Sequence, residues 1–120
     1  MVNMERVTYS LVAQFRKQDR LQRIIKNSFE FLKDNDATST VIHAIEQLEN
    51  DPLFNAGIGS QLQSDGKIRM SASIMNGNTK RFSGVINIEN IQNPIKVASE
   101  LMNEEDRVLG GDGANYMQKK

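Results

Sequence analysis

Hydrophobic positions in the first half of the chain recur at helical spacing. One stripe consists of Leu21, Ile24, Ile25, Ser28 and Leu32, and a second consists of Val41, Ala44, Ile45 and Leu48. Turn and cap residues at 34–36 separate the stripes, and Asp51-Pro52 follows the second, because proline drives the residue before it away from helical geometry. We therefore predict two amphipathic helices that pack side by side. A weaker, strand-like pattern covers residues 7–12.

From Lys67 onward the hydrophobic spacing changes to every second residue, as on a half-buried strand. The alternating positions are Ile68, Met70, Ala72 and Ile74, then Phe82, Gly84, Ile86 and Ile88. Asn76-Gly77 lies between the two runs and is a typical hairpin turn, so residues 67–89 are predicted to form an antiparallel hairpin. Asn93-Pro94 then predicts the cap and first position of a third helix. Its hydrophobic stripe is Ile95, Ala98, Leu101 and Met102.

The end of the chain predicts a short strand at residues 107–109 and a last helix after the Gly110-Gly111-Asp112-Gly113 run. The whole pattern indicates a single domain, residues 1–120, of the α/β (α+β) class, with helices packed on a mainly antiparallel sheet.

Composition excludes several classes of partner and of chemical site. Lys plus Arg and Asp plus Glu number 15 each, so no net field favours nucleic acid or an anionic membrane as a partner. The chain has no cysteine, which excludes a disulfide scaffold, a thiolate nucleophile and a cysteine zinc site. The first 18 residues lack the apolar core of a signal peptide. We expect a soluble, cytoplasmic protein without a nucleic-acid or membrane partner.

The stretch LENDPLFNAGIGS, residues 48–60, is unusually apolar for a connecting loop. Asn55 stands among hydrophobic residues. Its carboxamide can brace the loop or serve a function, and bracing is the simpler of these two explanations. Gly57 and Gly59 permit a tight turn. A loop folded this tightly can also turn carbonyl oxygens inward, as a sodium ion would require, but a plain tight turn is the simpler explanation of the glycines.

The other polar candidates have simpler structural explanations. Asp65-Gly66 is a residue pair typical of turns, and Asp112 lies in a glycine run too short to identify a ligand. His43, the only histidine, is interpreted as structural or exposed. Glu46, Glu49 and Asp51 cluster at a helix end, where solvation is expected. No serine or threonine here has an identifiable base and orienting partner.

Four segments in order, LENDPLFNAGIGS, SASIMNG, SGVINIENIQNPIKVASELM and GGDGA, resemble one known family. They are similar to the α-subunit region of plant-type L-asparaginases and isoaspartyl peptidases, a family that also includes glycosylasparaginases and threonine endopeptidases. The resemblance covers residues 36–118, about two thirds of the chain. It implies part of an αββα sandwich of the N-terminal nucleophile hydrolases, made as a precursor that cleaves itself autocatalytically.

The resemblance also implies a mechanism and partners. A threonine at the start of a β-subunit is the nucleophile and its own α-amino group the base, so no histidine is needed. The substrates are asparagine-type amides or β-aspartyl peptides, small molecules hydrolysed through an acyl-enzyme. The expected assembly is an (αβ)2 type, or self-association of this chain.

Two kinds of site residue follow from the resemblance. Asn55 is expected to support catalysis near the partner chain's threonine. The backbone carbonyls of Leu48, Glu49, Asp51, Phe54, Ala56 and Ile58 are expected to enclose a structural sodium ion. No organic cofactor is expected.

The sequence also departs from the family pattern. These 120 residues contain neither the opening HGGAG-like strand nor a threonine in a GTVGAV-like segment. Asn76 and Ser71 stand where the family has aspartate, and Asp112 replaces a glutamate. Two readings therefore remain: the α-part of an amide hydrolase, or a catalytically inactive homologue that acts as a scaffold or interaction module.

Overall fold

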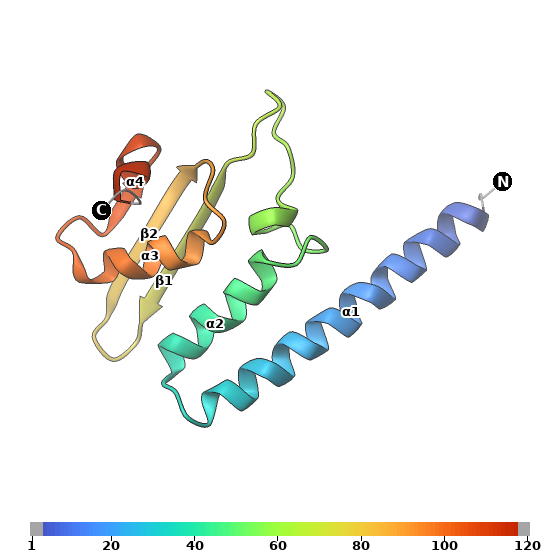
Figure 1. Ribbon diagram of the computed structural model, residues 1–120, viewed down its shortest axis with the longest axis horizontal. Coiled ribbons are helices and arrows are strands. Elements are labelled where there is room, and N and C mark those ends of the chain that lie inside the picture. The colour runs from blue at the N-terminus through green and yellow to red at the C-terminus, as the bar shows by residue number, and fades with distance from the viewer. Residues whose placement is uncertain (1–3, 118–120) are drawn as a thin grey trace.

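The computed structural model describes the backbone of residues 4–117 and the side-chain surroundings of residues 13–114. The helices are α1 Met4–Leu32, α2 Ala37–Glu49, α3 Pro94–Glu100 and α4 Asp112–Met117, with short 3-10 turns at Gly57–Gly59 and Leu101–Asn103. The strands are β1 Met70–Asn76, β2 Arg81–Ile88 and β3 Val108–Gly110. Figure 1 shows α3 lying across β1 and β2, with α2 and then α1 farther from the sheet. The α+β prediction is confirmed.

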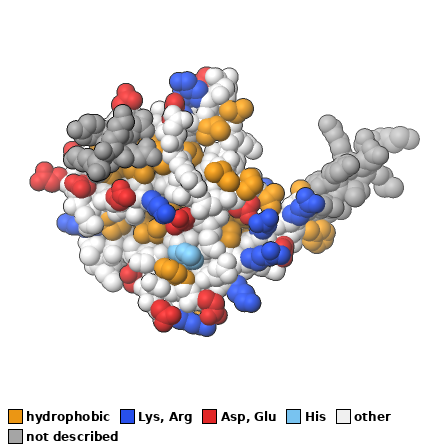
Figure 2. Space-filling view, viewed as in Figure 1, with side chains coloured by type: hydrophobic (Ala, Val, Ile, Leu, Met, Phe, Trp, Pro, Cys, Tyr) orange, Lys and Arg blue, Asp and Glu red, His pale blue; other side chains and the backbone are white. Residues whose placement is uncertain are grey.

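The first helix is longer than the sequence pattern predicted. Residues 7–12 lie within α1, so the strand-like pattern there was misleading. No glycine or proline interrupts residues 4–32, and the described sheet offers that segment no partner strand. Along the described part of α1, Lys and Arg side chains gather (Figure 2), which makes the charge distribution uneven although the net charge is zero.

The two predicted helices pack side by side, as expected, but only part of the first stripe is buried. Ile24 and Ser28 are buried, whereas Leu21, Ile25 and Leu32 remain exposed. Between α1 and α2 this leaves a groove of about 360 Å³ with an apolar lining. The face of α1 is therefore wider than α2 can cover.

Local signals at the ends of α2 act as predicted. The Asp36 side chain caps the start of the helix by accepting a hydrogen bond from the Ser39 N–H at 2.8 Å. This bond is the main reason why the pKa of the Asp36 carboxyl lies below its usual range. The helix ends at Glu49, directly before Asn50 and the Asp51-Pro52 pair.

The hairpin is antiparallel, but its turn is not the predicted two-residue Asn-Gly turn. Asn76 is the last residue of β1 and pairs with Arg81, leaving a loop at residues 77–80. The Asn76 Oδ1 accepts hydrogen bonds from the Asn78 and Thr79 N–H groups at 3.0 and 3.1 Å. Lys80 takes the positive φ, 54°. The side chain of Asn76 thus stabilises a longer turn than its dipeptide suggests.

A β-bulge also changes which side chains of β2 face the core. Met70 pairs with Ile88 and Ala72 with Val85, so residues 86 and 87 stand opposite residue 71 alone. Asn87 has a φ of 58°, and its N–H donates to the Ser71 Oγ at 3.2 Å. The predicted inward set of Phe82, Gly84, Ile86 and Ile88 was therefore largely wrong. Instead Ser83, Val85 and Ile88 face the core, with Gly84 buried between the strands.

The core lies between α3 and one face of the sheet. The predicted stripe of α3 is buried there against Ile74, Val85 and Ile88. Inside this core, the Ser83 Oγ donates to the Ala98 carbonyl oxygen at 2.6 Å. β3 runs parallel to β2, which makes the sheet mixed, and the order is β1-β2-β3.

The opposite face of the sheet has no covering layer among the described residues. Met75, Phe82, Ile86 and Val108 are each about half exposed there, and the face carries a shallow hollow of about 310 Å³. An apolar sheet face of this kind is normally covered by a second layer.

Candidate functional site

The loop between α2 and β1 is folded back on itself through two glycines. Gly57 has a φ of 51°, and a Cβ there would stand 2.2 Å from the Glu49 carbonyl oxygen. At Gly59 a Cβ would stand 2.0 Å from the carbonyl oxygen of Phe54 and 2.9 Å from that of Pro52. Only glycine allows these approaches, because no other residue could bring its backbone so close to another main chain. Three carbonyl groups are thus packed against the turn at residues 57–59.

The six carbonyls expected to bind sodium all belong to this loop and the last turn of α2. Those of Glu49 and Phe54 lie against the glycines, and the Ala56 carbonyl accepts the Gly59 N–H at 3.0 Å. A carbonyl oxygen has two lone pairs, so one internal hydrogen bond leaves it able to bind an ion. Neutral oxygen donors in a tight loop suit a hard monovalent cation, and the residues present fit that expectation.

Asn55 is exposed at the rim of this loop. Its Oδ1 accepts a hydrogen bond from the Gln61 N–H at 3.0 Å, so the carboxamide does brace the loop. Asn55 also lines a hollow of about 420 Å³, together with Ser60, Arg69 and Ser71. The structural role is thus established by contact, while the supporting role in catalysis remains a prediction.

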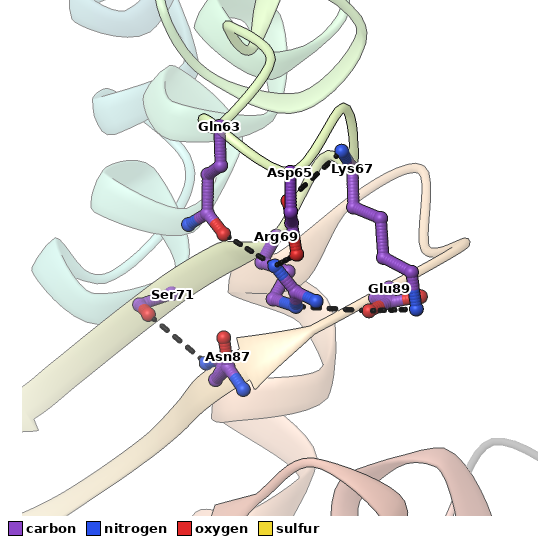
Figure 3. Close-up of polar contacts among 7 residues, drawn as sticks. All are labelled: Gln63, Asp65, Lys67, Arg69, Ser71, Asn87 and Glu89. Atoms are coloured by element: carbon purple, nitrogen blue, oxygen red, sulfur yellow. Dashed lines mark hydrogen bonds and ion pairs between the residues drawn. The ribbon is translucent and has the colours of Figure 1, made fainter.

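One wall of this hollow is fixed by a network centred on Arg69 (Figure 3). Its Nη1 donates to the Asp65 Oδ2 at 2.8 Å and to the Gln63 Oε1 at 2.6 Å, and its Nε donates to the Glu89 Oε1 at 3.0 Å. The hydrogen bond from Arg69 lowers the pKa of the Asp65 carboxyl. The network holds the Asp65-Gly66 turn, where Gly66 has a φ of 78°. The predicted turn at Asp65-Gly66 is confirmed.

The expectation that the acidic residues at the end of α2 are solvated was wrong for Glu49. This residue is 3% exposed. Its Oε1 accepts the Ile95 N–H at 3.0 Å, and its Oε2 accepts from the Asn93 Nδ2 at 3.2 Å. Asn93 consequently makes no side-chain cap on its own helix, and Glu49 satisfies an N–H of the first turn of α3 instead. Burial raises the pKa of the Glu49 carboxyl above its usual range.

Asp51 is also buried rather than solvated, with 8% of its surface exposed. Its Oδ1 accepts the Leu53 N–H at 3.0 Å, and its Oδ2 lies 3.4 Å from an Arg20 guanidinium nitrogen. Asp51 therefore ties the loop to α1, as Glu49 ties it to α3. One signal in the sequence could have indicated that these two acids are buried. Leu48, Pro52 and Leu53 beside them are apolar, which is unusual around solvated acids.

The remaining candidates have structural explanations. The His43 ring stacks on Phe31 at a centroid distance of 4.2 Å, which confirms the structural interpretation. Asp112 is exposed at the start of α4. Within the described residues, no three His, Cys, Asp or Glu side chains are placed to hold a metal ion. In the same part of the chain, no helix has both the length and the apolar character needed to cross a membrane.

Comparison with known proteins identifies the class. Residues 4–120 match the family model Asparaginase_2, described as asparaginase. The chain therefore belongs to this family, which confirms the resemblance and extends it over α1.

Three relatives show how the chain relates to longer proteins. An isoaspartyl peptidase/L-asparaginase of Synechocystis sp. is 48% identical over 95 residues, covering 78% of this chain and 29% of the relative. An isoaspartyl peptidase/L-asparaginase of Nostoc sp. is 54% identical over 84 residues, which cover 70% of this chain and 26% of the relative. A plant-type L-asparaginase of Pyrococcus furiosus is 42% identical over 107 residues, which cover 82% of this chain and 35% of the relative. The chain spans between a quarter and just over a third of the length of these relatives.

Proposed function

We propose that this chain forms the α-part of an isoaspartyl peptidase/L-asparaginase-type hydrolase. The supporting observation is the match to relatives with those names across the glycine-folded loop and its adjoining hollow. In this proposal the nucleophile is an N-terminal threonine of a β-part, released by autocatalytic cleavage. Its attack on an asparagine side-chain amide, or on a β-aspartyl peptide bond, gives an acyl-enzyme that water hydrolyses.

Asn55 is the side chain of this chain that we assign to the active site. Its Oδ1 is engaged by the Gln61 N–H, which orients the carboxamide at the rim of the hollow. The Nδ2 group makes the carboxamide a donor as well as an acceptor. We propose that this donor positions the partner's threonine, while the acceptor holds the loop.

The loop supplies a structural sodium site in the same proposal. Carbonyl oxygens of Leu48, Glu49, Asp51, Phe54, Ala56 and Ile58 would hold the ion. The observation that supports this is the packing of carbonyl groups against Gly57 and Gly59. The ion would fix the loop conformation and with it the place of Asn55.

The open face of the sheet supports the proposed partner. Met75, Phe82, Ile86 and Val108 are about half exposed on it. A second sheet contributed by the β-part would cover this apolar surface and complete an αββα sandwich, within an (αβ)2-type assembly.

The first experiment is to purify the natively expressed protein, measure its intact mass and sequence any co-purifying chain from its N-terminus. A partner that begins with threonine, together with hydrolysis of β-aspartyl dipeptides or asparagine, is the expected result. A single inactive species would instead favour the scaffold interpretation.

Variants of Asn55 test its assigned role in the active preparation. Asn55→Asp keeps an acceptor for the Gln61 N–H but loses the donor, so we expect unchanged folding and a large loss of kcat. Asn78→Ala, in the exposed hairpin loop, is the matched control and should keep full activity. If Asn55→Asp keeps wild-type kcat, the carboxamide serves the loop alone.

A further inference from the structure

Glu49 has an unusual electrostatic position. Its carboxylate is buried, and both of its oxygens accept hydrogen bonds, from the Ile95 N–H and the Asn93 Nδ2. Both donors are neutral. Among the ion pairs of the described residues, none includes Glu49. A buried carboxylate without a salt-bridge partner is costly, and a cation bound nearby would offset part of that cost.

The neighbouring charged groups are already paired with one another. Lys96, the nearest lysine on α3, lies 2.6 Å from the Glu46 Oε1. Arg20 lies beside Asp51. Of the three acids at the end of α2, Glu49 alone therefore has no salt-bridge partner among the described residues, although it is the most deeply buried.

The main chain of the same residue forms the wall of the glycine-folded loop. The Glu49 carbonyl oxygen lies against Gly57, where even a Cβ would not fit. The carbonyl groups of this loop are neutral, so they can replace the water around an ion but cannot balance its charge. A carboxylate on the same residue as one of these carbonyls can supply the balancing negative charge.

We propose that the Glu49 carboxylate is the counter-charge that makes the carbonyl loop bind a monovalent cation. This inference rests on the sodium site of the proposed function and adds a side chain to it. The Glu49 side chain has a positioning role. The main-chain carbonyl of Glu49 is one of the proposed ligands, whereas the carboxylate acts through its charge and is held at the first turn of α3 by the Ile95 N–H. Loss of an outer group of this kind typically weakens metal binding about 10- to 100-fold.

The test measures the thermal unfolding midpoint of the chain at pH 8 in rising NaCl, with choline chloride added to keep the ionic strength constant. Glu49→Gln keeps an acceptor for the Ile95 N–H but removes the charge. Glu46→Gln, one turn earlier on α2, is the matched control because it removes an equal charge from an ion pair. A swap, Glu49→Gln with Asn93→Asp, reverses the Glu49–Asn93 hydrogen bond and returns the charge to the same pair.

We expect sodium to raise the midpoint of the wild type and of Glu46→Gln over the same concentration range. Glu49→Gln should need at least about tenfold more sodium, and the swap should restore most of the response. Equal sodium responses in the wild type and Glu49→Gln would overturn the counter-charge while leaving the sodium loop intact. No sodium-specific response in the wild type would overturn both.

Should Glu49→Gln alone fail to unfold cooperatively, the swap decides. A folded swap with a wild-type sodium response supports the proposal. In the swap the negative charge lies on residue 93 instead of residue 49, so the response would follow the charge and not the glutamate itself. A folded swap without a response overturns it.

Discussion

Alanine substitutions at four glycines separate the two reasons for which this fold uses glycine. Gly77 has neither a positive φ nor an atom within 4 Å of its would-be Cβ. Gly66 has a φ of 78° in open space, whereas a Cβ at Gly59 would meet the Phe54 carbonyl oxygen at 2.0 Å without a positive φ. Gly57 combines both, with a φ of 51° and the Glu49 carbonyl oxygen at 2.2 Å. The series thus varies strain and contact independently.

The expected losses in free energy of unfolding follow from these geometries. Gly77→Ala should be neutral or stabilising by up to ~1 kcal/mol, because alanine restricts the unfolded chain. Gly66→Ala should cost about 1 kcal/mol from left-handed strain. Gly59→Ala should cost ~1–3 kcal/mol, because backbone atoms must move. Gly57→Ala carries both penalties and should cost roughly 2–5 kcal/mol.

Urea unfolding followed by far-UV circular dichroism measures these values, provided that the slope m stays constant across the series. The decisive comparison is the order of Gly57→Ala and Gly66→Ala. If Gly57→Ala is no more damaging than Gly66→Ala, the contact with Glu49 does not exist as described. The carbonyl packing that supports the ion loop would then be refuted as well.

Three further outcomes are expected. Asp36→Asn should destabilise the chain at neutral pH, because it keeps the cap acceptor but removes the negative charge at the start of α2. The lowered pKa of Asp36 stabilises the fold above the ordinary value of 3.8, and this contribution is lost as the pH falls through the folded-state value, so the deficit of the variant should shrink in acid. An unchanged deficit at pH 2.5 in urea titrations would contradict the contribution of the Asp36 charge. Ser83→Ala should cost about 1 kcal/mol in urea unfolding, because the hydrogen bond to Ala98 is lost, and no change would mean that the buried hydroxyl contributes nothing. The chain without a partner should self-associate in light scattering, and Ile86→Ser on the open sheet face should raise the monomer fraction; a wild-type monomer would count against an unsatisfied face.

Local signals were sufficient for much of the fold. Helix α2 begins and ends where Asp36 and Asp51-Pro52 predicted, and Pro94 opens α3. These signals act within a few residues, so the sequence contains both partners of each interaction. The hairpin was predicted for the same reason, since its two strands are neighbours along the chain.

Errors arose where distant contacts decide the outcome. The bulge at Asn87 places Val85 and Ile88 on one face, and simple alternation cannot indicate such a shift. Glu49 was assigned to solvent because its partner, Ile95, lies 46 residues later. At the candidate site, the glycines revealed the tight loop, but the acids that hold it could be identified only from tertiary structure.

Those acids explain how so apolar a loop can stay folded at the edge of the domain. Asp51 fastens it to α1 through Arg20, and Glu49 fastens it to α3 through the Ile95 N–H. Side-chain bonds at the end of α2 therefore hold the loop in place, while its main-chain carbonyls pack against the glycine turn. The ties to α1 and α3 use side chains, so they do not occupy the carbonyl oxygens of the loop. The Asp51, Phe54 and Ala56 carbonyls do accept main-chain hydrogen bonds within the loop, but a carbonyl oxygen has two lone pairs, so each can still bind an ion.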